Sequence, residues 1–129
     1  MHRASTALAV AASLFGFFVL NAEPSTQTAP ALGVLRVAPE QTSEPDAVVT
    51  VTFDRPVAGG LDEAVDAEAL FRIEPAVEGK AEWRDPVTLR FTPAAPLRPG
   101  ATYTVTIAND FAAMDGARLP RPHRFTFRV

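Results

Sequence analysis

Apolar and polar residues alternate with a period of two through much of the chain after residue 33. Successive side chains of a β-strand point to opposite faces of a sheet, so this alternation predicts strands with one buried face. The pattern is clear at residues 49–53, 87–92, 102–107 and 124–129, and weaker at 35–37 and 71–73. A further strand is expected at residues 80–83, which brings the total to about seven.

In two of these segments the pattern predicts which individual side chains point into the core. Leu35 and Val37 flank Arg36, so we expect the two apolar side chains to point inward and the arginine to point outward. Trp83 stands between two charged residues, a setting that favours a tryptophan buried between two sheets.

Prolines and turn residues separate the predicted strands. Most of the 12 prolines lie between strands, where a residue without a backbone N–H does not interrupt a sheet. Turn signals recur roughly every eight to twelve residues in the second half, as in antiparallel sandwiches and barrels. Leu61, Val65 and Leu70 favour a short helix between residues 59 and 71, and residues 109–114 are expected to form another single turn.

Residues 97–103 read Leu-Arg-Pro-Gly-Ala-Thr-Tyr and lead directly into an alternating segment. A tyrosine near the start of the penultimate strand is typical of a tyrosine corner, in which the hydroxyl bonds to backbone a few residues upstream. Together with the strand pattern, this corner predicts an all-β fold, a single Ig-like β-sandwich of about seven antiparallel strands.

The N-terminal residues have the features of an export signal. A short basic start is followed by an apolar run over residues 7–20 and by a small residue for cleavage at Ala22. We therefore expect a signal peptide, helical in its apolar part, at residues 1–22, a flexible tether at 23–32 and the sandwich domain at 33–129.

An uncleaved membrane anchor is the alternative to cleavage, although the apolar run is shorter than the roughly 20 residues of a spanning helix. The chain has no cysteine, which excludes a cysteine-linked lipid anchor, disulfides, thiol catalysis and cysteine metal sites. Both interpretations predict an extracytoplasmic domain, either periplasmic or secreted, or tethered to the membrane by the N-terminal segment.

Charge narrows the range of partners. The chain carries 12 basic and 15 acidic residues, so nucleic acid is not expected as a partner, and the membrane is expected only through an uncleaved N-terminal segment. Acidic residues dominate between residues 40 and 85, and arginines dominate after residue 86. This asymmetry fits a polarised surface for head-to-tail packing or for a basic partner. We favour the simpler alternative, that strand interleaving mixes the charges in space.

No catalytic constellation can be recognised in the sequence. After residue 22 the serines are Ser25 and Ser43, and the histidine is His123, at the start of the last strand. Nucleophilic catalysis needs a nucleophile held by an oriented base, and these residues do not suggest one. The acids between Glu74 and Asp85 are expected to be solvated charges rather than a glycosidase pair. We therefore expect no enzyme activity, no catalytic residue and no cofactor.

The loop between the last two predicted strands offers the best material for a metal site. Asp110 and Asp115 supply oxygen atoms of the kind that Ca²⁺ binds, but their spacing does not match an EF-hand. Asp115 and Gly116 more simply predict a turn with glycine at positive φ. We assign no metal site and keep calcium as the alternative. Phe111 and Met114 are expected to plug the end of the sandwich.

Several segments, taken in order, carry a family resemblance over nearly the whole chain after the tether. They are residues 51–57, 71–75, 79, 83, 89–93, 97–103, 115–119 and 125–127. In these segments the chain resembles bacterial Ig-like domains of the S-layer protein type, and it is also similar to the N-terminal domains of bacterial alpha-2-macroglobulin-like proteins.

The resemblance implies an exported, non-enzymatic module that serves as a spacer or adhesion domain and contacts a protein or another cell-envelope component. The alternative is an amino-terminal fragment of a bacterial alpha-2-macroglobulin-like protease inhibitor. The thioester and bait region that this family implies have no counterpart in these 129 residues, which contain no cysteine. We therefore expect either a free-standing exported domain or the amino-terminal piece of a larger protein.

Overall fold

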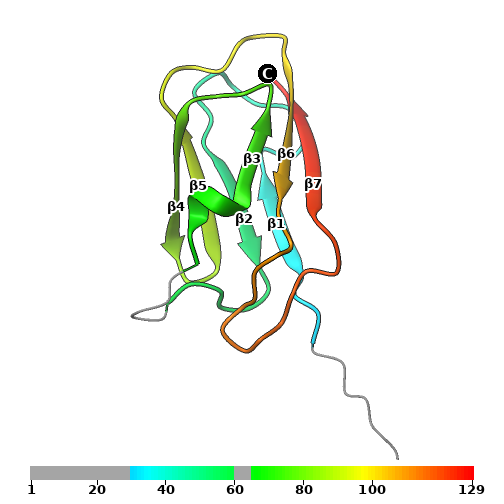
Figure 1. Ribbon diagram of the computed structural model, residues 1–129. Helices are drawn as coiled ribbons and strands as arrows, with labels where there is room; N and C mark the ends of the chain where they lie inside the picture. Colours follow the sequence, from blue (N-terminus) through cyan, green and yellow to red (C-terminus); the bar gives the residue numbers. More distant parts are fainter. Residues whose placement is uncertain (1–29, 60–64) are drawn as a thin grey trace, which may run out of the picture.

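Seven strands form two antiparallel sheets that pack face to face in the computed structural model, which describes residues 30–59 and 65–129 (Figure 1). The first sheet has the order β1 (Val34–Ala38), β2 (Val49–Phe53), β5 (Thr88–Pro93) and β4 (Gly79–Asp85). The second has the order β3 (Phe71–Glu74), β6 (Thr102–Ile107) and β7 (His123–Arg128), and the helical turn α1 (Ala67–Leu70) precedes β3. The predicted all-β sandwich is confirmed.

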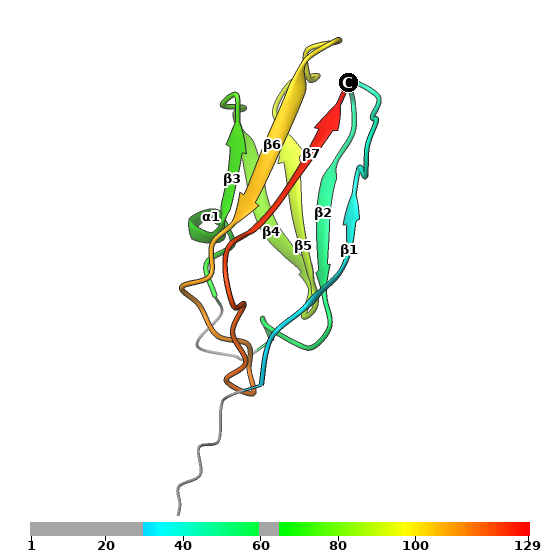
Figure 2. The same cartoon turned by 90° about the vertical axis from the view of Figure 1, so that its right-hand side faces the viewer.

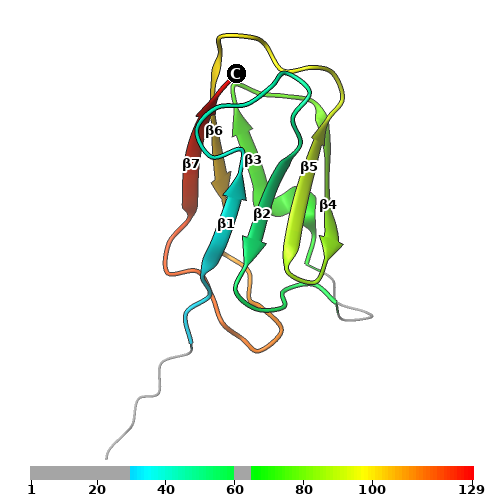
Figure 3. The same ribbon diagram turned by 180° about the vertical axis from the view of Figure 1, so that it is seen from behind.

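The strand orders give the sandwich two lateral sides. The edge strands β3 and β4 lie on one side, and the edge strands β1 and β7 lie on the other (Figures 2 and 3). Backbone bonds partly close the β1–β7 side. The Ser43 N–H donates to the Arg128 carbonyl, and the Arg128 N–H donates to the Gln41 carbonyl, both at 2.9 Å.

The folded domain includes the last residues of the predicted tether. Leu32 is only 2% exposed and belongs to the core. Its N–H donates to the Arg118 carbonyl at 2.9 Å, and Ala31 forms a parallel bridge with Arg118. Ala31 and Leu32 are therefore part of the domain. The predicted signal peptide and most of the tether lie outside the described residues, and in the described part no helix is long and apolar enough to cross a membrane.

Alternation assigns the faces of the central strands correctly. The inward residues of β2 and β6 are at most 5% exposed: Val49, Val51, Phe53, Tyr103, Val105 and Ile107. The prediction for β1 is wrong for Leu35, which is 70% exposed, but Val37 packs against the core and Arg36 is exposed, as predicted. The register of β1 on β2 shifts between Val34 and Arg36, and such a bulge reverses the faces on either side of it. Val34 packs against the core in place of Leu35.

The tyrosine corner is confirmed. The Tyr103 hydroxyl accepts a hydrogen bond of 3.0 Å from the N–H of Arg98, five residues upstream. The Tyr103 ring is 5% exposed and stacks on Phe127 of β7, with ring centroids 5.7 Å apart. The corner thus fixes the loop before β6 to the core through one ring and one hydrogen bond.

The two predicted helical turns have different outcomes. α1 forms where a helix was expected, and Asp66 caps it by accepting a 3.0 Å bond from the Glu68 N–H. Leu61 and the rest of residues 60–64 lie outside the described residues. The helical turn expected at residues 109–114 is wrong, since this segment holds no helix. The chain turns at Gly116 instead, whose φ of +89° fits the predicted glycine turn.

Aromatic packing differs partly from the expectation. Phe111 plugs the core as predicted, at 7% exposure and with its ring 5.9 Å from that of Phe53. Met114 is 59% exposed, so its predicted plugging role is wrong: it lies in the turn that leads to Gly116. Trp83 is half-buried rather than buried, because β4 is an edge strand that leaves one side of the indole open.

Candidate functional site

The residues considered for nucleophilic catalysis lie apart. Ser43 bonds to the backbone of Arg128, the last residue of β7, whereas His123 is the first residue of that strand. Five strand residues at roughly 3.4 Å each separate the two positions by about 17 Å. The Ser43 hydroxyl donates to the Glu44 carbonyl at 2.7 Å, and desolvation lowers the pKa of His123. The structure therefore brings no serine and histidine together; Ser25 lies outside the described residues.

The Asp115 carboxylate, considered as a calcium ligand, is engaged with protein groups. One oxygen accepts a 3.0 Å bond from the Ala117 N–H, and the other accepts a 3.1 Å bond from Nη1 of Arg55. These two donors, in that order, hold the pKa of Asp115 below its ordinary value. The described residues contain no group of three or more His, Asp or Glu side chains that could hold a metal ion.

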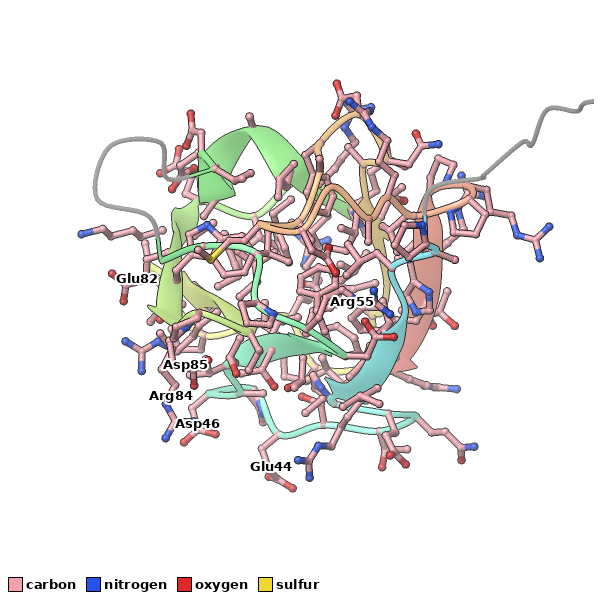
Figure 4. The ribbon with its side chains drawn as sticks, turned by 90° about the horizontal axis from the view of Figure 1, so that it is seen from below. Glu44, Asp46, Arg55, Glu82, Arg84 and Asp85 are labelled. Atoms are coloured by element: carbon pink, nitrogen blue, oxygen red, sulfur yellow. The ribbon has the colours of Figure 1, made fainter. Side chains whose placement is uncertain are left out.

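Arg55 ties two loops together at one end of the sandwich. Besides Asp115, its Nε donates to Asp54 at 3.0 Å, and this contact is the main cause of the lowered pKa of Asp54. Seen from below, Arg55 lies within the outline of the molecule (Figure 4). The other labelled side chains, Glu44, Asp46, Glu82, Arg84 and Asp85, lie at the periphery and point away (Figure 4). The Arg55 contacts therefore link the loop after β2 to the loop between β6 and β7.

A groove lies between the β3 and β4 edges, on one lateral side of the sandwich, and has a volume of about 870 Å³. Its apolar lining comes from both sheets: Phe71, Ile73, Val77 and Phe91. The rings of Phe71 and Phe91 stack with centroids 4.5 Å apart and planes 12° from parallel. Charged residues at the rim are Glu68, Glu78, Lys80 and Glu82. This volume falls within the range of pockets that bind ligands or peptide side chains.

Small side chains line one end of the groove and leave it unfilled. Gly79 begins β4 opposite Pro93 of β5. A Cβ atom at Gly79 would collide with the Thr92 carbonyl oxygen, the Phe91 ring and the backbone of Pro93. Ala76 and Ala94 line the same region. Glycine and alanine therefore stand where a larger side chain would collide with β5 or fill the groove.

Two glutamates at the rim of the groove accept hydrogen bonds, one from an arginine side chain and one from a backbone N–H. Glu82 accepts a 2.8 Å bond from Nη2 of Arg90, and this pair is the main cause of the lowered pKa of Glu82. Glu68 accepts a 2.7 Å bond from the N–H of Ala81, which caps one outward donor of edge strand β4. Capping an edge in this way prevents uncontrolled strand addition. The Trp83 indole N–H, bonded to the Val65 carbonyl at 2.7 Å, fixes the segment before α1 to the same edge.

The chemistry of the groove suits binding rather than catalysis. Its lining residues include no serine, cysteine, histidine or tyrosine. Two of its three glutamates, Glu82 and Glu68, are already bonded to Arg90 and to the Ala81 N–H. The third, Glu78, has no serine, cysteine, histidine or tyrosine beside it in the lining to form an oriented catalytic pair. An apolar floor with charged groups at the rim is the usual composition of a protein-contact surface.

Charges from the two halves of the sequence mix only in part. Arg90 pairs with Glu82, and Asp115 pairs with Arg55, as strand interleaving predicts. The lateral sides nevertheless differ. Glu68, Glu78 and Glu82 lie at the β3–β4 groove, while the β1–β7 side carries exposed arginines at Arg36, Arg121, Arg124 and Arg128.

The family model for the bacterial Ig-like domain matches residues 26–129. The chain belongs to the bacterial Ig-like domain family. The resemblance expected from the sequence is thus confirmed, and the match includes all seven strands. No curated protein matches the chain in sequence.

Several solved structures share the fold of this bacterial Ig-like domain. Domains 1–6 of surface layer protein SbsC match with a TM-score of 0.55 and 22% identity over 78% of this chain and 14% of that one. Alpha-2-macroglobulin from Escherichia coli, spanning domains MG0-NIE-MG1, matches with a TM-score of 0.55 and 22% identity over 77% of this chain and 32% of that one. An L,D-transpeptidase from Mycobacterium smegmatis matches with a TM-score of 0.51 and 20% identity over 75% of this chain and 39% of that one.

These identities establish a common fold and no more. The bacterial Ig-like domain spans 39% or less of each of these three structures. The groove was not found by sequence reasoning, which considered Glu74, Glu78 and Glu82 only as possible catalytic acids. Gly79 is the one local sign of the groove in the sequence, because it follows Pro75 at the end of one strand and begins the next strand. The residues that Gly79 packs against belong to β5, and the sequence around Gly79 does not identify them.

Proposed function

We propose that this bacterial Ig-like domain is an exported, non-enzymatic module that contacts proteins of the cell envelope. The export signal predicted at residues 1–22, and a sequence in which no catalytic constellation is recognised, support this function. Family membership supports it as well, because Ig-like sandwiches are widely used as contact domains on cell surfaces.

The observation that carries the proposal is the groove between β3 and β4. Its stacked Phe71 and Phe91 rings offer an apolar floor, and an aliphatic or aromatic side chain from a partner would bury area there. The partner is a protein or another cell-envelope component with an apolar anchor and basic groups that match the glutamates at the rim.

Co-sedimentation with a cell-envelope fraction tests this function. Residues 23–129 can be used, because the core side chains of the described residues all lie between Leu32 and Phe127. We expect Val77→Asp to reduce the retained fraction about tenfold, since a charge on the groove floor costs more than the roughly 1.4 kcal/mol that corresponds to that factor.

Met114→Asp is the matched control, because it makes the same apolar-to-acid change at a residue that is 59% exposed in the loop between β6 and β7, outside the groove and off the β1 and β7 edges. It should be retained like the unmodified domain. Full retention of Val77→Asp in its folded state would overturn the proposal, and so would an equal loss with Met114→Asp.

A further inference from the structure

The side of the sandwich opposite the groove carries an exposed apolar side chain. Among the described residues, Leu35 is the most exposed large hydrophobic residue, at 70%. The bulge between Val34 and Arg36 turns it away from the core, in edge strand β1. A single exposed leucine needs no explanation by itself, but its charged surroundings distinguish this one.

Arginines from both sheets flank this side. Arg36 stands beside Leu35 in β1, and Arg124 and Arg128 are exposed in β7. Within residues 30–59 and 65–129 none of these arginines forms an ion pair. The β1 and β7 edges, which carry this apolar group and these arginines, lie opposite the β4 edge (Figure 3). The groove beside β4 has three glutamates and one lysine at its rim.

Within each sheet, an arginine at one edge strand has a glutamate at or next to the opposite edge strand. Arg36 and Glu82 belong to opposite edge strands of the first sheet, β1 and β4. Arg124 belongs to β7 of the second sheet, and Glu68 lies in α1, the helical turn that leads into the opposite edge strand β3 of that sheet. A sideways translation of one domain past another would thus set positive charge against negative charge in both layers.

We infer that the groove binds the β1 edge of a second copy of this domain, with Leu35 on the Phe71–Phe91 floor and Arg36 against the glutamates of the rim. This inference rests on the proposed contact function and names its partner. Each copy carries both halves of the contact on opposite sides, so the interface is heterologous and extends the assembly into a row instead of closing it as a dimer.

Sedimentation velocity of residues 23–129 tests the inference. The average mass should rise with protein concentration, and the rise should weaken between 0.01 M and 0.1 M salt, as the screening length falls from about 30 Å to about 10 Å. Leu35→Asp removes the inserted side chain and Val77→Asp removes the groove floor, so each variant alone should stay monomeric at every concentration.

Mixing the two variants gives the decisive result. The Leu35→Asp chain keeps its groove and the Val77→Asp chain keeps its β1 edge, so the mixture should reach twice the monomer mass and grow no further. Glu78→Arg, at an exposed rim position, replaces Val77→Asp if that variant is destabilised. An unmodified domain that stays monomeric would overturn the inference, and so would a mixture that stays monomeric.

The two proposals fail in different ways. If the unmodified domain is monomeric but Val77→Asp still loses retention by the envelope fraction, self-association is overturned and the contact function stands, with a basic segment of another protein as the occupant. If the domain self-associates but neither variant changes envelope retention, the groove serves copies of this chain and the wider envelope function is overturned.

Discussion

Tyr103→Ala should lower the free energy of unfolding by about 3–5 kcal/mol, the usual cost of removing a buried aromatic side chain. The change removes the ring that stacks on Phe127 and leaves the Arg98 N–H without its acceptor. Tyr103→Phe removes only the hydroxyl and should cost about 1 kcal/mol, the net value of a typical hydrogen bond. Urea unfolding of residues 23–129 measures both differences.

Thr126→Ala, at an exposed position of β7, is the control and should change stability by no more than about 0.5 kcal/mol. The pair of tyrosine variants separates packing from hydrogen bonding at the corner. If Tyr103→Phe is as stable as the unmodified domain, the bond to Arg98 does not hold the corner. If Tyr103→Ala costs less than about 1 kcal/mol, the ring is not part of the core.

Gly79→Val should destabilise the domain by about 1–3 kcal/mol, as expected when bulk is forced into a packed site. Even a Cβ atom would meet the Thr92 carbonyl oxygen and the Pro93 backbone, so β4 and β5 must separate where the groove begins. The same change should weaken retention by the envelope fraction, because it displaces the strand that carries one wall of the groove.

Lys80→Val is the matched control, since it places the same β-branched side chain one residue further along β4, where the side chain is exposed. A β-branched residue is well tolerated in a strand, so the melting temperature of this variant should change little. Equal melting temperatures for Gly79→Val and the unmodified domain would show that the close approach of β4 and β5 is not a fixed feature of the fold.

The sequence predicts the fold well where local pattern and tertiary structure agree. β2 and β6 alternate strictly because each buries one face in the middle of its sheet, and the corner at Tyr103 is a local motif read within seven residues. β1 departs from its pattern because an edge strand has a partner on one side only and accommodates the bulge that exposes Leu35.

The candidate site could not be predicted in the same way. Phe71 and Phe91 each follow the alternation of their own strand, and nothing in either strand shows that their rings stack across the two sheets. Trp83 was expected in the core because its neighbours are charged, but the position of β4 at an edge leaves it half-buried. The groove lies between edge strands of two different sheets, so its shape depends on how the sheets pack. The alternation within a single strand does not predict that packing.

The central claim is that the groove between β3 and β4 contacts protein in the cell envelope. A photo-activated cross-linking amino acid at position 77 of the full chain, irradiated in living bacteria, tests it most directly. We predict cross-linked protein adducts in the envelope fraction from position 77 and none from position 114, which is exposed in the loop between β6 and β7, outside the groove and off the β1 and β7 edges. The absence of adducts from position 77, or equal adducts from both positions, would contradict the claim.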